Sequence, residues 1–164
     1  MTLEEIGILA QVAGTLGVIA SLVFVGVQIR QNTKTTRAQV QENMTSGYVE
    51  VVCLLTDHAE VFARGIAATP ETFPSFSNTD KVVFFSVLFA AFKHFENIHS
   101  QHRRGFIDRE SWNAWSENVL MHFNQPGVQM WWSLRKGSFG LRFREFVESS
   151  PVPKVPTTVD VLRG

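Results

Sequence analysis

One uninterrupted apolar stretch, residues 6–29, constrains the fold of this chain more than any other feature. The stretch has no charged residue, and its polar side chains are few: Gln11, Thr15, Ser21 and Gln28. As an α-helix rising ~1.5 Å per residue it reaches about 36 Å, which is enough to cross a hydrocarbon core of ~30 Å with some tilt. We therefore predict a single transmembrane helix near the N-terminus.

The residues on either side of this stretch indicate how the helix is inserted. A secretory signal peptide begins with basic residues and ends at a small-x-small cleavage site. This chain instead begins with Glu4 and Glu5 and continues after the stretch without such a site, which favours an uncleaved anchor. Lys and Arg mark the cytoplasmic end of a membrane helix, and Arg30, Lys34 and Arg37 all follow the stretch. We predict a single-pass protein with its N-terminus outside and its C-terminal domain in the cytoplasm.

Small residues gather on one side of this predicted helix and bulky residues on the other. At ~100° per residue, the small side carries a set of residues at three- and four-residue spacing: Ala10, Ala13, Gly14, Gly17 and Ser21. Such spacing lets two helix backbones approach closely, and in lipid this packing drives helix association. We predict that the five residues form an interface with a second copy or with another membrane protein subunit. The alternative is that Gly and Ala are simply common in membrane helices.

The anchor, residues 1–30, is expected to continue into a helical neck at residues 31–55, because no Pro or Gly interrupts the junction. Apolar residues return along the neck at helical spacing: Met44, Tyr48, Val51, Val52 and Leu55. This stripe is a second candidate surface for association with other proteins. The polar residues before it suit the headgroup level of a bilayer.

The rest of the chain is predicted to be all-α, since no run of strand period occurs. The cytoplasmic domain, residues 56–150, is expected to be a bundle of about four to five helices, followed by an extended tail at 151–164. The expected elements are a helix capped at 57–60, a loop at 69–80, a central helix at 81–104 stopped by Gly105, a helix at 109–124 capped by Asp108, a helix opened by Pro126, and an amphipathic helix at 139–149.

Composition narrows the function classes. The formal net charge is zero, which gives no reason to expect binding to nucleic acid. The single cysteine, Cys53, excludes an internal disulfide framework, and its apolar neighbours predict a buried, unreactive thiol. The chain has 14 phenylalanines, so an aromatic-rich core is expected.

Several segments together resemble a known group of proteins. The opening MTLEEIG, the segment VFVGVQIRQNT, and the later segments FENIHSQHRRGFID, QPGVQMWW and FREFVE are similar to those of widespread, uncharacterised small bacterial proteins. The resemblance covers the chain from Met1 to about Glu148. It implies a bacterial inner-membrane protein with one N-terminal membrane helix and a helical cytoplasmic domain, and it implies no activity. The chain departs from the usual Phe-Ser-Pro-Glu-Phe turn of the group, because it has FGLRF at residues 139–143.

Catalytic chemistry has one candidate position in the sequence. Glu96 and His99 form a Glu-x-x-His pair with His102 nearby, a spacing that di-iron bundles use twice. No second pair occurs here, and neither a Gly-x-Ser-x-Gly motif nor a phosphate-binding glycine loop is found, so no catalytic, metal or cofactor residue is assigned. The alternative is a polar helix end in which Glu96 pairs with His99 or Arg103.

These observations favour a non-enzymatic, membrane-anchored interaction or scaffold protein that self-associates or serves as an accessory subunit of a membrane complex. One alternative is a small homo-oligomeric channel or transport component, in which Gln11 and Thr15 line a water-filled path. Another is a metal-dependent enzyme that uses Glu96 and His99. A further open point is whether the aromatic and basic residues of segment 131–146 contact the membrane surface or pack in the core.

Overall fold

The computed structural model describes residues 2–151, and this part of the chain is helical without any strand. Its helices are α1 (Leu3–Asp57), α2 (Ala59–Ile66), α3 (Asn78–Arg103), α4 (Arg109–Phe123), α5 (Pro126–Arg135) and α6 (Leu141–Ser149), with two short 3-10 helices, η1 (Phe73–Ser75) and η2 (Lys136–Ser138). The prediction of an all-α fold is therefore confirmed for the described residues. Of the tail predicted at residues 151–164, residues 152–164 lie outside the described part of the chain.

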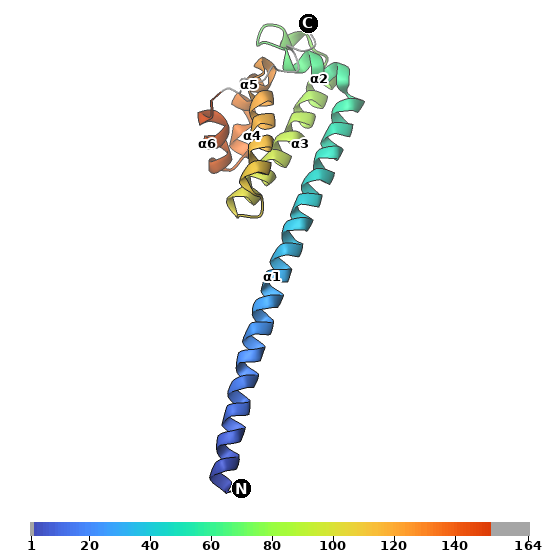
Figure 1. Ribbon diagram of the computed structural model, residues 1–164. Coiled ribbons are helices and arrows are strands. Elements are labelled where there is room, and N and C mark those ends of the chain that lie inside the picture. Colours follow the sequence, from blue (N-terminus) through green and yellow to red (C-terminus); the bar gives the residue numbers. More distant parts are fainter. Residues whose placement is uncertain (1, 152–164) are drawn as a thin grey trace. The chain divides into compact units, whose positions relative to one another are not determined.

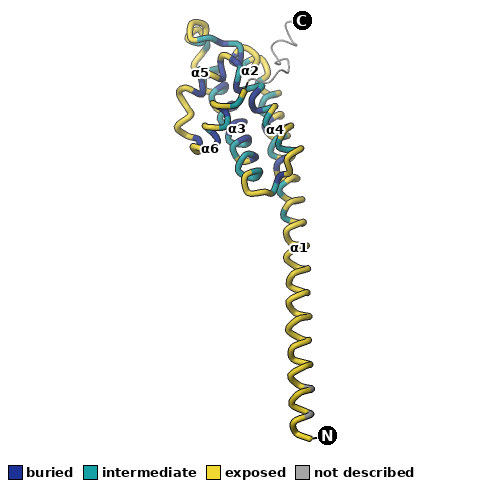
Figure 2. The backbone as a smooth tube through the Cα atoms, turned by 60° about the vertical axis from the view of Figure 1, so that its left-hand side comes forward, coloured by how far each residue is buried: buried dark blue, intermediate teal, exposed yellow. Residues whose placement is uncertain are grey.

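The predicted continuation of the apolar helix into the neck is confirmed, because α1 runs unbroken from Leu3 to Asp57 (Figure 1). The chain falls into two units, Met1–Gln39 and Val40–Gly164, and α1 contributes to both. In the first unit nearly all the residues of this helix whose burial is described are exposed (Figure 2). The hydroxyl groups of Thr33 and Thr36 each donate to the backbone carbonyl four residues earlier, so these two polar groups are satisfied within the helix.

The second unit is built around α3, which contacts α2, α4 and α6, and α3 and α4 lie side by side (Figure 1). The aromatic-rich core that the composition predicts is present. Phe84, Phe92 and Trp131 have no exposed surface. Phe92 lies at the centre of this core, with its ring centroid 5.2 Å from that of Trp131 and 5.7 Å from that of Trp132.

The apolar stripe of the neck is part of the same core. Met44 and Val51 are buried, and Tyr48 packs edge-on against Trp115 with ring centroids 5.0 Å apart. The Nδ2 group of Asn118 lies 3.4 Å from the Tyr48 hydroxyl. The prediction that this stripe associates with other proteins is therefore wrong for four of its five residues, because Met44, Tyr48, Val51 and Leu55 pack wholly or partly against their own chain. Val52 alone among the five stripe residues is exposed.

Glycines permit three close approaches within the second unit. A Cβ atom at Gly47 of α1 would lie 2.9 Å from the ring of His94 on α3. Where α2 meets α5, a Cβ atom at Gly127 would overlap the carbonyl oxygen of Gly65. Where α2 meets α3, a Cβ atom at Gly65 would overlap the ring of Phe84. The helices reach these separations only because the side chain is absent.

The helix boundaries follow local capping chemistry. The Ser111 N–H donates to Asp108 Oδ1 at 2.8 Å, which confirms the predicted cap of α4. Gly105 has φ +77°, and the N–H groups of Gly105 and Phe106 donate to the carbonyls of His102 and Gln101, which closes the end of α3 in a Schellman motif.

Two predicted helix starts are wrong. Asp57 belongs to the end of α1, and α2 begins after His58 without any side-chain cap. The central helix α3 starts at Asn78 rather than at residue 81, because Ser77 caps it by accepting the Asp80 N–H at 3.1 Å. The predicted loop before it contains the short helix η1.

The aromatic residues of segment 131–146 pack inside the unit. Trp131, Trp132, Phe139 and Phe143 are buried, whereas the cations Arg135, Lys136 and Arg142 are exposed. The Trp132 indole N–H donates to Glu148 Oε1 at 3.0 Å, which fixes the ring against α6. These rings are core residues and do not form a membrane-contacting surface.

Candidate functional site

The predicted interface lies in the first unit, where all five of its residues are exposed on α1: Ala10, Ala13, Gly14, Gly17 and Ser21. A Cβ atom at Gly14 or Gly17 would meet no other atom within 4 Å, so a second helix has room to approach there. The Ser21 hydroxyl donates to the Gly17 carbonyl at 2.9 Å, which satisfies its polar group inside the helix. The surface suits close packing, and the interface itself stays a prediction.

The bulky side of the same helical segment is also exposed. Ile8 and Leu16 keep 62% and 61% of their surface open, and Val23 keeps 62%. Burying one such side chain is worth about 1.5–3 kcal/mol, so an open row of them marks a surface that favours an apolar environment. By length and composition, this helix is able to cross a membrane.

Gln11 and Thr15 form the polar pair that is predicted to line a channel, and the hydroxyl group of Thr15 is hydrogen-bonded within its own helix. The Thr15 hydroxyl donates to the Gln11 carbonyl at 2.9 Å. A threonine in this arrangement carries no free donor for water or an ion, because its hydrogen is already used. The water-filled path through several copies stays a prediction.

Cys53 is exposed, so the expectation of a buried thiol is wrong. It follows the buried Val51 by two positions, which places it about 200° around the helix from that residue. The apolar neighbours of Cys53 in the sequence therefore do not indicate burial. Its position around the helix, opposite the buried Val51, does indicate exposure.

Glu96 and His99 lie on α3, but their side chains have separate contacts. Glu96 Oε1 accepts the Gly140 N–H at 2.6 Å, and Oε2 pairs with Lys93 Nζ at 2.8 Å. Glu96 therefore fastens the start of α6 to α3 and neutralises Lys93, rather than pairing with His99 or Arg103. Among the side chains that the structure describes, no group of three or more from His, Cys, Asp and Glu is placed to hold a metal ion.

Histidine rings are stacked on aromatic rings in the second unit, a feature that the sequence reasoning missed. The His102 ring lies parallel to Trp112 with centroids 4.7 Å apart, and the His99 ring stacks on Phe146 at 5.3 Å. The His94 ring packs against both Tyr48 and Trp115, and its Nε2 atom is buried without a hydrogen-bond partner in the described chain. The sequence did carry a signal for this cluster. His94, His99 and His102 lie on the same helix as the apolar core residues of α3.

Burial lowers the pKa of three imidazoles of the second unit, those of His94 and His99 on α3 and of His122 on α4. Opposing this, the Glu50 carboxylate raises the pKa of His94, whereas the nearby Arg103 and His102 lower that of His99 further. Each ring is therefore held neutral to a lower pH in the folded state than in the unfolded state.

We expect acidification to destabilise the second unit between about pH 7 and pH 5. In this window the unfolded chain binds protons at its histidines, with a pKa near 6.5, while the folded chain does not, so the free energy of unfolding falls as the pH falls. Urea unfolding at about pH 7.5 and about pH 5.5 measures the difference. His122→Gln should flatten this pH dependence, and an equal free energy at both pH values in the unsubstituted protein would contradict the expectation.

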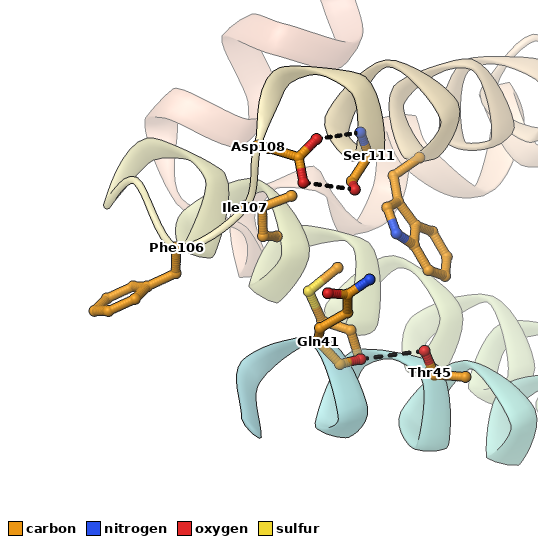
Figure 3. A pocket seen from close by; sticks show the side chains of 8 residues that line it. Gln41, Thr45, Phe106, Ile107, Asp108 and Ser111 are labelled. Carbon is orange, nitrogen blue, oxygen red and sulfur yellow. Dashed lines mark hydrogen bonds between the residues drawn. The ribbon is translucent and has the colours of Figure 1, made fainter. Parts of the chain in front are cut away.

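A small cavity of about 70 Å³ lies where α1 meets the α3–α4 turn (Figure 3). Gln41, Met44 and Thr45 line it from α1, and residues 106–108, Ser111 and Trp115 line it from the other side. Sites for small organic ligands enclose ~300–1,000 Å³, so this volume suits a few water molecules. Both Asp108 oxygens accept hydrogen bonds from Ser111, so that carboxylate caps a helix and is not free for a ligand.

No family model, no curated protein and no solved structure matches this chain. The resemblance of its segments to small bacterial membrane proteins therefore stays a prediction. The features that bear on function are the exposed apolar half of α1 and the charges and packing of the second unit.

Proposed function

We propose that this is a membrane-anchored, non-enzymatic interaction protein in which the first unit of α1 crosses a bilayer once. The observation that carries the proposal is the exposure of the described apolar side chains between Ile6 and Ile29. Soluble proteins rarely expose contiguous apolar patches larger than a few hundred Å². A bilayer removes this whole surface from water, and the helix satisfies its own backbone hydrogen bonds, as a lipid environment requires.

The proposed orientation places the second unit in the cytoplasm of a bacterial cell. Arg30, Lys34 and Arg37 are exposed directly after the apolar stretch, and none of them forms a salt bridge within the described residues. Unpaired cations at one end of a membrane helix favour retention of that end on the cytoplasmic side. Fusing a reporter that is active only in the cytoplasm to the C-terminus tests this orientation.

The proposed activity is association through the small-residue side of the anchor, either with a second copy or with another membrane subunit. Support comes from the open space at Gly14 and Gly17 and from the internally satisfied Ser21 hydroxyl. The second unit offers less support for catalysis, since the carboxylates of Glu96 and Asp108 are engaged in structural hydrogen bonds.

We expect Gly17→Leu to convert an assembly of the full-length protein into smaller particles, because the new side chain separates two backbones that otherwise touch. Mass photometry of protein purified in mild detergent, together with crosslinking in the native membrane, measures the change. Val23→Leu on the bulky side of the helix is the matched control and should leave the particle mass unchanged. An unaltered particle mass for Gly17→Leu would rule out this side as the interface.

A further inference from the structure

The turn between α3 and α4 presents unpaired positive charge on a rigid support. Arg103, Arg104 and Arg109 are exposed, and none of them lies within salt-bridge distance of a carboxylate in the described chain. By contrast, four other cations do have carboxylate partners: Arg64, Lys93, Lys136 and Arg142. The two acidic residues within the turn are Asp108, whose oxygens both accept hydrogen bonds from Ser111, and Glu110.

The backbone holds these arginines in place. The Schellman closure at Gly105 fixes the end of α3, and the buried Ile107 anchors the chain immediately before α4. His102 is held by its stack on Trp112, and its Nδ1 atom lies 3.3 Å from the Ile107 carbonyl oxygen. Phe106, which is half-buried, points away from Asp108 and Ser111 (Figure 3). The turn is thus a fixed loop with arginines at its outer side.

The position of this turn in the second unit is informative. Phe106 and Ile107 share the small cavity with Gln41, so the turn lies at the end of the unit where α1 enters it. Only residues 30–40 separate Gln41 from the apolar stretch, and the segment 30–41 covers about 18 Å as a helix. Whatever the orientation of the second unit, this short tether keeps the arginines at a high effective concentration near the surface of any bilayer that holds the anchor.

We propose that this arginine turn, consisting of Arg103, Arg104 and Arg109 with Phe106, docks on anionic phospholipid headgroups. The inference rests on the proposed membrane anchoring, because the tether supplies the proximity. Phosphate oxygens accept charge-assisted hydrogen bonds from guanidinium groups, and the half-buried aromatic ring suits the interfacial zone. Each arginine near an anionic surface should favour the docked state about fivefold.

Fluorescence quenching in full-length protein reconstituted into vesicles tests the docking. A fluorophore is attached at Asn113→Cys in a Cys53→Ser background, since Asn113 is exposed on α4 one turn beyond Arg109. A trace of nitroxide-labelled phosphatidylcholine serves as quencher in vesicles of pure phosphatidylcholine and in vesicles with about 30% phosphatidylglycerol, the anionic component. We expect stronger quenching in the anionic vesicles. A label on the exposed native Cys53, about 18 Å further along α1 than Gln41, should show no such difference.

Removal of the charges gives the decisive comparison. Arg103→Gln with Arg104→Gln should lower the ratio of docked to undocked protein by about 25-fold, whereas Arg135→Gln with Lys136→Gln removes the same charge elsewhere and should leave the quenching unchanged. Salt at about 0.5 M should weaken the quenching of the unsubstituted turn, because it shortens the Debye length to ~4 Å. Equal effects of the two double substitutions, or no effect of salt, would overturn the assignment.

The two proposals fail in different ways. Protein that floats with both kinds of vesicle but shows equal quenching in them would overturn the arginine turn and leave the anchor intact. Protein that does not float with pure phosphatidylcholine vesicles, or that is extracted from them by alkaline carbonate, would overturn the membrane anchor itself.

Discussion

Phe92→Ala is expected to destabilise the second unit by about 3–5 kcal/mol, which is a large part of the total stability of a domain of this size. Phe92 has no exposed surface, and its ring packs against five other aromatic rings: those of Phe95, Phe123, Trp131, Trp132 and Phe139. Truncation removes this buried area and leaves a cavity that helices on several sides cannot all move to fill. The midpoint of thermal unfolding should fall by more than about 10 °C.

Tryptophan fluorescence during urea unfolding in mild detergent measures this loss, because all four tryptophans lie in the second unit and none in the first. Val82→Ala on the same helix is the matched control, since Val82 is 65% exposed, and it should change the free energy of unfolding by less than about 0.5 kcal/mol. A loss below about 1 kcal/mol for Phe92→Ala would show that the aromatic core does not pack as described.

Gly127→Ala is expected to destabilise the same unit by about 3 kcal/mol or more, although it adds a single methyl group. The new Cβ would overlap the Gly65 carbonyl oxygen, and this atom belongs to the backbone of α2, so no side-chain rotation relieves the clash. Either α2 and α5 separate, which opens the core around Val128 and Ile66, or the backbone near Gly65 distorts. Both responses weaken packing that is otherwise fully buried.

Gly137→Ala provides the comparison for this substitution. Gly137 is exposed in η2, and a Cβ atom there meets nothing within 4 Å, so the methyl group should be tolerated or slightly stabilising. The same urea titration serves both variants. If Gly127→Ala unfolded at the same urea concentration as Gly137→Ala, the close crossing of α2 and α5 would be refuted.

The sequence predicted the helical elements well where the signal was local. The unbroken helix over residues 3–57 follows from apolar and helix-forming residues without an intervening proline, and Asp108, Pro126 and Gly105 mark real helix ends. The missed start of α3 also had a local signal, because Ser77 stands three positions before Asp80, which is a capping spacing.

Other features depend on partners far away in the sequence and were not predictable from local patterns. The stripe containing Met44, Tyr48 and Val51 shows helical spacing, but the pattern alone does not say whether it faces its own chain or another protein. The contacts of Glu96 with Gly140 and of Tyr48 with Trp115 join segments that come together only in the folded unit. The candidate interface on the anchor lies on an exposed surface. The sequence pattern therefore does not identify the partner that would cover it.

The packing of Tyr48 against α4 has a consequence for how the chain is made. Tyr48 and Asn118 are separated by 70 positions, and at about 5–20 residues per second a ribosome needs about 4–14 seconds to synthesise that interval. During this time the inward face of residues 44–55 has been translated but its covering helices have not. Nascent chains that pause before residue 118 should therefore be unusually sensitive to proteases and to chaperone binding at this segment.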